Sequence, residues 1–141
     1  MADPIVRVDA GDLAALQRAL RRFDPELARA FRARLRDIAK VVAGEAKGRA
    51  GWSRRIPAAI RPFVESRGAG VLVSAKRAPH GPLYEDVRHR GSFRHPLFGN
   101  RRHWYSQRTR PFLQPAVEAK RGFIRREAEA AIEEAKREVR L

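Results

Sequence analysis

The strongest constraint on the fold of this chain is a stripe of apolar side chains between residues 24 and 50. Apolar residues recur there at every third or fourth position, which is the repeat of one helix face. Asp24 and Pro25 precede the stripe as a capping residue and a first helical residue. The pattern predicts an amphipathic helix of about 25 residues, whose apolar side packs against the domain or against a neighbouring subunit. The stripe consists of Leu27, Phe31, Leu35, Ile38, Val42 and Ala46.

Shorter patterns precede and follow this helix. Residues 5–8 alternate and predict a short strand, and apolar residues at helical spacing up to Phe23 predict a first helix, so that helices span about 12–48. Two β-prone runs surround Arg67-Gly68-Ala69-Gly70 and predict a hairpin at about 60–76. A second periodic stripe, with Pro115 in its first turn, predicts a C-terminal helix at about 114–139.

Residues 77–111 differ from the rest of the chain. They hold all four histidines, five of the eleven aromatic residues and several prolines and glycines. We expect a long ordered loop, and such loops in small domains are usually functional or interfacial. The prediction is one α+β domain over 1–141, with two N-terminal helices, a small antiparallel β-sheet with a hairpin, this loop and a C-terminal helix.

Positive charge is concentrated in the middle of the chain. The net charge is +15, and residues 51–112 hold 13 basic and 3 acidic side chains. Such a field attracts phosphate backbones or acidic protein surfaces without sequence specificity. Arginine outnumbers lysine 26 to 5, which the codon bias of a GC-rich genome would also produce. Both interpretations of the charge stay open.

The sequence carries few signs of chemistry. Cysteine is absent, which removes disulfides, thiolate metal sites and cysteine nucleophiles. No serine elbow, phosphate-cradling loop or dinucleotide motif occurs. A metal-dependent nuclease built on loop histidines such as His95 and His103 is a weak alternative, because the surrounding arginines would repel a cation. We therefore expect no enzyme, metal or cofactor.

Targeting signals are also lacking. No apolar run approaches the roughly 18–20 residues of a membrane span, and the first residues lack the apolar region of a secretory signal. We expect no membrane association, and assembly in the cytoplasm.

Arginines interleave with aromatic residues between positions 88 and 110. If exposed, this set would grip phosphates and stack on bases, as in a basic nucleic-acid-binding module. If buried between proteins, the aromatic residues would be anchors and the arginines their polar rim. The proline-stiffened Phe-Arg-His-Pro-Leu-Phe-Gly at 93–99 favours a docking segment.

Two segments resemble a known family. FRHPLFGNRRHW at 93–104 and RPFLQPAVEA at 110–119 are similar to the small neck, head–tail connector or tail-completion proteins of long-tailed double-stranded DNA bacteriophages. The resemblance implies a structural virion protein that joins or completes the head–tail junction as a ring around the DNA channel, with sixfold symmetry. It implies contacts with further copies of the chain and with neighbouring neck, tail terminator and tail-tube proteins. Whether the ring is the tail-completion, stopper or terminator ring stays open.

The resemblance also assigns residues to roles. The motif that opens the last helix against the core would be Pro111, Phe112, Leu113 and Pro115. The interface with a neighbouring subunit or ring would contain Phe93, His95, Pro96, Leu97, Phe98, Trp104 and Tyr105. Non-specific contacts with channel DNA or an acidic partner would come from Arg90, Arg94, Arg101, Arg102 and Arg108.

Overall fold

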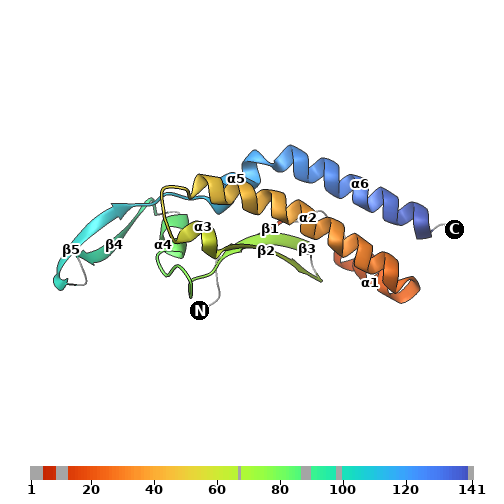
Figure 1. The fold of residues 1–141 in the computed structure, drawn as a ribbon, viewed down its shortest axis with the longest axis horizontal. Coiled ribbons are helices and arrows are strands. Elements are labelled where there is room, and N and C mark those ends of the chain that lie inside the picture. The colour runs from red at the N-terminus through yellow and green to blue at the C-terminus, as the bar shows by residue number, and fades with distance from the viewer. Residues whose placement is uncertain (1–4, 9–12, 67, 87–89, 98–99, 140–141) are drawn as a thin grey trace.

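The computed structural model describes residues 5–8, 13–66, 68–86, 90–97 and 100–139, and over these residues the fold is α+β, as predicted. The molecule is elongated, with the long helices and one sheet forming the body and a second sheet projecting from one end (Figure 1). The elements in chain order are β1 (Ile5–Val8), α1 (Leu13–Phe23), α2 (Pro25–Arg49), α3 (Ile56–Ala59), β2 (Ile60–Glu65), β3 (Gly68–Val73), α4 (Gly81–Glu85), β4 (Ser92–Leu97), β5 (Asn100–Arg108), α5 (Leu113–Ala119) and α6 (Arg121–Val139).

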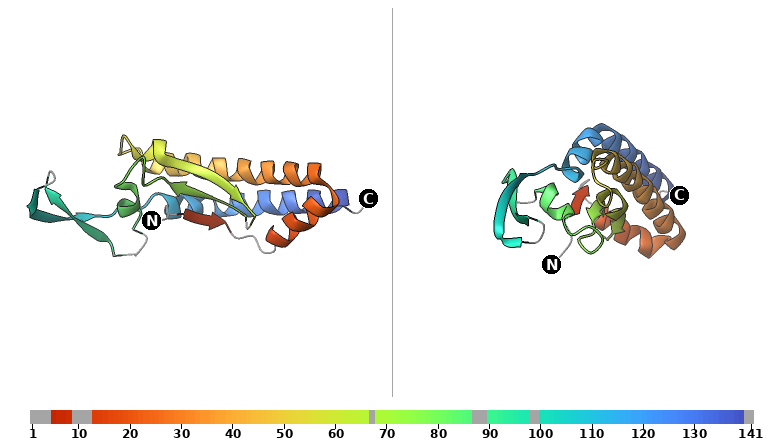
Figure 2. Two further views of the ribbon diagram at one scale, coloured as in Figure 1. Left: turned by 90° about the horizontal axis from the view of Figure 1, so that it is seen from below. Right: turned by 60° about the vertical axis from the view of Figure 1, so that its left-hand side comes forward.

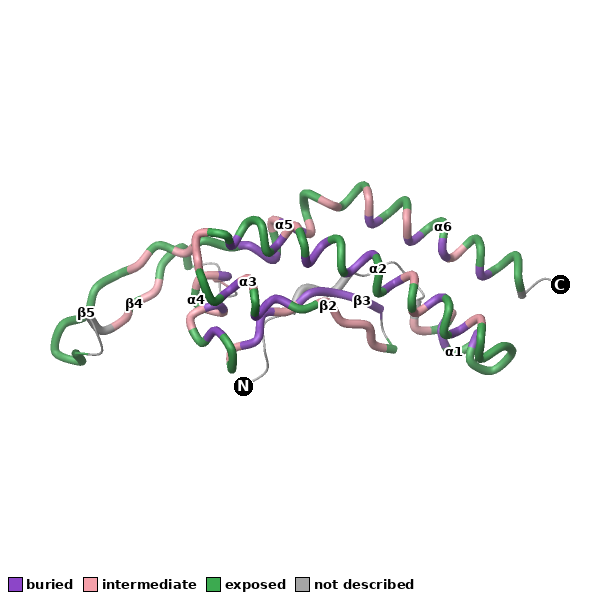
Figure 3. The backbone as a smooth tube through the Cα atoms, in the orientation of Figure 1, coloured by how far each residue is buried: buried purple, intermediate pink, exposed green. Residues whose placement is uncertain are grey.

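Helix α2 is the centre of the body and begins where the sequence predicts. The Asp24 carboxylate accepts hydrogen bonds from the backbone N–H groups of Glu26 and Leu27, at 3.1 and 3.2 Å, and Pro25 is the first helical residue. The predicted apolar stripe is buried except for Leu27, which is half-buried. It faces the sheet and the C-terminal helices, whereas the outer side of α2 is exposed (Figure 3). Local capping and periodicity therefore account for this helix.

The body sheet is antiparallel, with β3 between β1 and β2. The predicted hairpin is present, since Ile60 pairs with Val73 and Glu65 with Gly68. Gly68 and Gly70 lie within strand β3, which takes up more of the glycine-rich segment than the sequence suggests. Pro62, which lacks an N–H, lies on the edge strand β2, where a missing donor costs little.

The C-terminal helix differs from the predicted single element. It divides into α5 and α6 at Lys120, whose N–H donates to Ala116 at 3.1 Å, while Ile124 donates to the Lys120 carbonyl at 2.8 Å. The apolar spacing continues through this break, so periodicity alone does not reveal it. Helix α6 then lies along α2, burying small side chains such as Ala128, Ala131 and Ala135.

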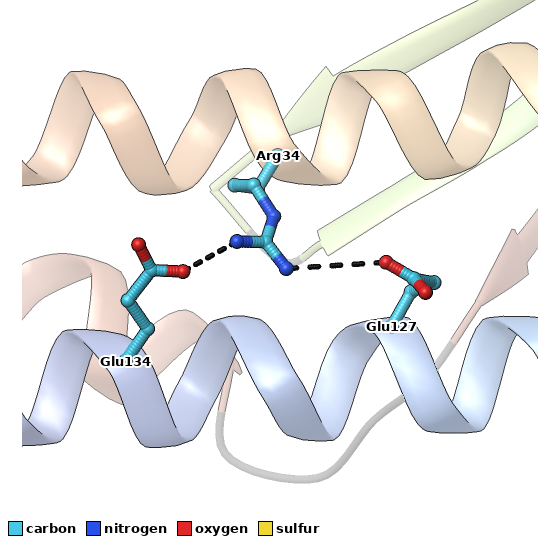
Figure 4. A network of polar contacts seen from close by, with 3 residues as sticks. All are labelled: Arg34, Glu127 and Glu134. Atoms are coloured by element: carbon cyan, nitrogen blue, oxygen red, sulfur yellow. Dashed lines mark hydrogen bonds and ion pairs between the residues drawn. The ribbon is translucent and has the colours of Figure 1, made fainter.

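One arginine joins the two long helices at their exposed edge. Arg34 of α2 bridges Glu134 and Glu127 of α6, the latter at 3.9 Å (Figure 4). All three side chains are more than one-third exposed, so solvent screening keeps their contribution to stability small. Packing of the apolar stripes, rather than this network, holds α6 in place.

Two predictions made from the sequence are wrong. Residues 77–111 are not one long loop: they contain α4 and the paired strands β4 and β5. The sequence does not predict β4 and β5, because neither face of these strands is continuously apolar. The alternation of apolar and polar residues that indicates a strand is therefore missing. Phe23, predicted on the apolar side of the first helix, is 72% exposed at the end of α1.

Candidate interaction surface on the projecting hairpin

Strands β4 and β5 form an antiparallel hairpin that extends away from the body (Figure 2). Their register pairs Ser92 with Arg108, Arg94 with Ser106 and Pro96 with Trp104, and an irregularity follows Pro96. The alternate positions pair Phe93 with Gln107 and His95 with Tyr105. Because paired residues of antiparallel strands point to the same side, the hairpin has two chemically different faces. We call them the arginine face (Ser92, Arg94, Trp104, Ser106, Arg108) and the aromatic face (Phe93, His95, Tyr105, Gln107).

The aromatic face continues into the body as a row of ring contacts. Trp52 lies 4.8 Å from Tyr84 between ring centroids, and Tyr84 lies 5.0 Å from Phe93. His95 follows at 5.9 Å from Phe93 and 4.3 Å from Tyr105. Most of these contacts are edge-to-face, the arrangement that aromatic quadrupoles favour. The row joins the base of the hairpin to the body.

Asp86 holds the base of the hairpin. It adopts a left-handed conformation, with φ of 60°, and its carboxylate accepts hydrogen bonds from the N–H groups of Arg90 and Gly91, both at 2.8 Å. The Thr109 hydroxyl donates to the same carboxylate at 3.2 Å, and the Thr109 N–H donates to the Gly91 carbonyl at 3.0 Å. One carboxylate therefore binds both ends of the hairpin, and Gly91 supplies a positive φ of 79°.

The neighbouring Glu85 fixes the following helix. Its buried carboxylate accepts three backbone N–H groups at the start of α5, from Phe112 at 2.7 Å, Leu113 at 2.8 Å and Gln114 at 2.9 Å. These are groups that a helix cannot satisfy internally. The two successive acids thus connect α4, the hairpin and α5, and the Arg110 guanidinium stacks on Trp52 at 4.3 Å beside them.

The arginine face and the first residues of β5, Asn100 to Arg102, are open to solvent. The predicted contact residues Arg90, Arg94, Arg101, Arg102 and Arg108 are all exposed. Residues 90–110 hold six arginines and no acid, and none of the five exposed arginines forms an ion pair with another described residue. Trp104 is 48% exposed, and its indole N–H donates to the Arg101 carbonyl at 2.6 Å. The segment therefore presents uncompensated positive charge.

The remaining predicted residues divide between the hairpin and the core. In the predicted interface set, Phe93 and His95 are half-buried, Tyr105 is 44% exposed, Pro96 and Leu97 belong to β4, and Phe98 lies outside the described residues. In the predicted helix-opening motif, Phe112 and Leu113 are fully buried, Pro115 is half-buried and Pro111 is exposed. Phe112 and Leu113, at the start of α5, therefore pack in the hydrophobic core.

The positioning residues Trp52, Glu85 and Asp86 were not singled out as functional from the sequence. One signal was present: between residues 66 and 117, Glu85 and Asp86 are the only acids in a strongly basic segment. Isolated acids in such a segment are candidates for structural hydrogen bonding. Of the loop histidines, His80 lies at the start of α4, where burial, and then the charge of Arg55, lower its pKa below the ordinary 6.5.

The described residues contain no group of three or more His, Asp or Glu placed to hold a metal ion. No helix in the described ranges has both the length and the apolar character of a membrane span. No family model, curated protein or solved structure matches the chain.

Proposed function

We propose that this protein is a non-enzymatic structural component of a phage neck or tail top, which acts by packing into a homo-oligomeric ring at the head–tail junction. The observation that carries the proposal is the projecting hairpin with its partly exposed aromatic face. A lone two-stranded hairpin is at best marginally stable in water. This hairpin nevertheless extends from the body and carries partly exposed aromatic side chains. Such a surface is suited to be covered by another protein.

The shape of the molecule supports a ring. The hairpin is at one end of the long axis and the C-terminal end of α6 is at the other (Figure 1). A hairpin that docks on the next copy makes a head-to-tail contact between different surfaces, and such contacts close into rings when the rotation allows. In this proposal the ring is a hexamer, the further partners are adjoining neck, terminator and tail-tube proteins, and the protein resides in the virion.

The oligomeric state in solution tests the proposal. Light scattering after size exclusion, repeated over a range of protein concentrations, is expected to show a multimer. The double change His95→Ala and Tyr105→Ala removes two rings of the aromatic face and is expected to give monomers. Phe23→Ala is the control, because it deletes a more exposed ring, which lies on α1 and outside the hairpin.

Circular dichroism of each variant verifies that the fold is intact. A wild-type chain that stays monomeric at all concentrations, and also beside the neighbouring tail and connector proteins, would refute the ring. A monomer that nonetheless binds nucleic acid at physiological salt would favour the alternative, a free-standing basic nucleic-acid-binding module.

A further inference from the structure

We infer that the arginine face of the hairpin is a sequence-independent binding site for the phosphate backbone of duplex DNA, and that Trp104 belongs to this site rather than to the subunit interface. The inference concerns the hairpin alone and goes beyond the ring, which it does not require. It rests on the segregation of residues by strand register, on their charge and on the shape of the element.

The composition of the arginine face suits the binding of phosphate. Arg94 pairs with Ser106, and Arg108 pairs with Ser92, so the two arginines are diagonal neighbours at about 7–8 Å. Arginine and serine are among the residue types that donate most hydrogen bonds to phosphate oxygens. The guanidinium fork matches two phosphate oxygens at once. The pattern thus places phosphate-binding groups on both strands of one face.

The contrast between the two faces favours DNA over an acidic protein surface as the partner of the arginine face. The core of a protein interface is depleted in charged residues and rich in aromatic ones, which describes the aromatic face with Phe93, His95 and Tyr105. On the arginine face, arginines pair with serines across the two strands, and Trp104 is the aromatic residue beside them. That combination is typical of nucleic-acid surfaces, where exposed rings accompany arginines.

Among the described residues, no acid forms an ion pair with the arginines of this face. The nearest acids along the chain are Glu85 and Asp86, and their carboxylates accept backbone N–H groups at the base of the hairpin and of α5. Neither is placed as an ion-pair partner of Arg94 or Arg108. The charge of the face is therefore available to an external anion.

The shape of the hairpin also suits the binding of a duplex. The major groove of B-form DNA admits a two-stranded β-ribbon, and the hairpin extends along the long axis beyond the rest of the molecule (Figure 2). A duplex can reach the arginine face without meeting the long helices α2 and α6. The arginines and serines of this face can donate to phosphate oxygens, and such backbone contacts carry no sequence information.

Fluorescence anisotropy with a short labelled duplex of mixed sequence tests the inference, with the dissociation constant measured over a series of salt concentrations. Each phosphate contact contributes about 0.9 to the slope of log affinity against log salt. The double change Arg94→Gln and Arg108→Gln is expected to reduce that slope by about 1.8. The double change Arg125→Gln and Arg126→Gln on the exposed side of α6 removes the same charge and is the matched control.

Trp104→Ala is expected to weaken binding, and Phe23→Ala, which removes an exposed ring from α1, to leave it unchanged. Equal losses in the hairpin and α6 double variants would show an effect of net charge only and would overturn the inference. So would binding of polyglutamate with no binding of the duplex, which would identify an acidic protein as the partner. Light scattering on the same samples keeps failure of the ring distinct: intact multimers without DNA binding overturn only this site.

Discussion

The carboxylate of Glu85 provides a sharp test of how the candidate site is built. It lies at the end of α4 and accepts three N–H groups at the start of α5, which begins 28 residues further along the chain. Glu85→Ala deletes the acceptor and leaves at least two buried N–H groups, those of Phe112 and Leu113, without a partner. The change touches no residue of the hairpin faces, so its effect reports on the anchor itself.

The expected loss follows from the three bonds. An unsatisfied buried donor costs about 1–3 kcal/mol, so two of them, together with the half-buried Gln114 bond, lower the free energy of unfolding by about 4 kcal/mol. For a chain of this size that corresponds to a melting temperature lower by roughly 10 °C. Glu85→Gln keeps one carbonyl acceptor and is expected to lose only about 1–2 kcal/mol.

Urea unfolding followed by circular dichroism, at one fixed protein concentration, measures this loss. Glu118→Ala is the control, because Glu118 also lies at α5 but forms an exposed ion pair with Arg121 at 2.9 Å. Its loss is expected to stay below about 1 kcal/mol. A Glu85→Ala protein within about 1 kcal/mol of wild type would refute the account of Glu85 as the anchor of α5.

Two further outcomes follow from the contacts around α4. Gly81→Ala is expected to lower the free energy of unfolding by about 1–3 kcal/mol, because the new Cβ would lie 2.8 Å from a Val73 methyl carbon; an unchanged melting temperature would contradict this close packing. The lowered pKa of His80 means that the unfolded chain binds a proton more readily, so stability is expected to fall as the pH drops below about 6.5. A His80→Gln protein should show a shallower decline in urea titrations over that pH range, and an identical pH profile would contradict the assignment.

The sequence indicates the body of the fold well because local rules act there. Asp24 caps α2 and Pro25 opens it, and the apolar spacing defines the side that is buried. The same rules predict the hairpin of β2 and β3. They do not show the break at Lys120, since the helical repeat continues through it. They also miss the pairing of β4 with β5, because no alternating apolar face marks those strands.

The composition of the candidate site could be predicted from the sequence, but its arrangement could not. The sequence shows that residues 90–110 contain six arginines, several aromatic residues and no acidic residue. Their distribution over two faces is not visible in the sequence, because a register shift of one residue would exchange the faces. Asp86 binds both ends of the hairpin, through the backbone N–H groups of Arg90 and Gly91 and through the hydroxyl of the distant Thr109.

The amino-acid sequence by itself determined the long helices, the α+β class and the concentration of positive charge in the middle of the chain. Those properties depend on neighbours within a few residues and on composition. Only the tertiary structure decided that Glu85 caps a helix from a distance, that Arg94, Trp104 and Arg108 share a face, and that this face projects from the body. These arrangements need contacts between separated segments, and local periodicity does not encode which segments meet.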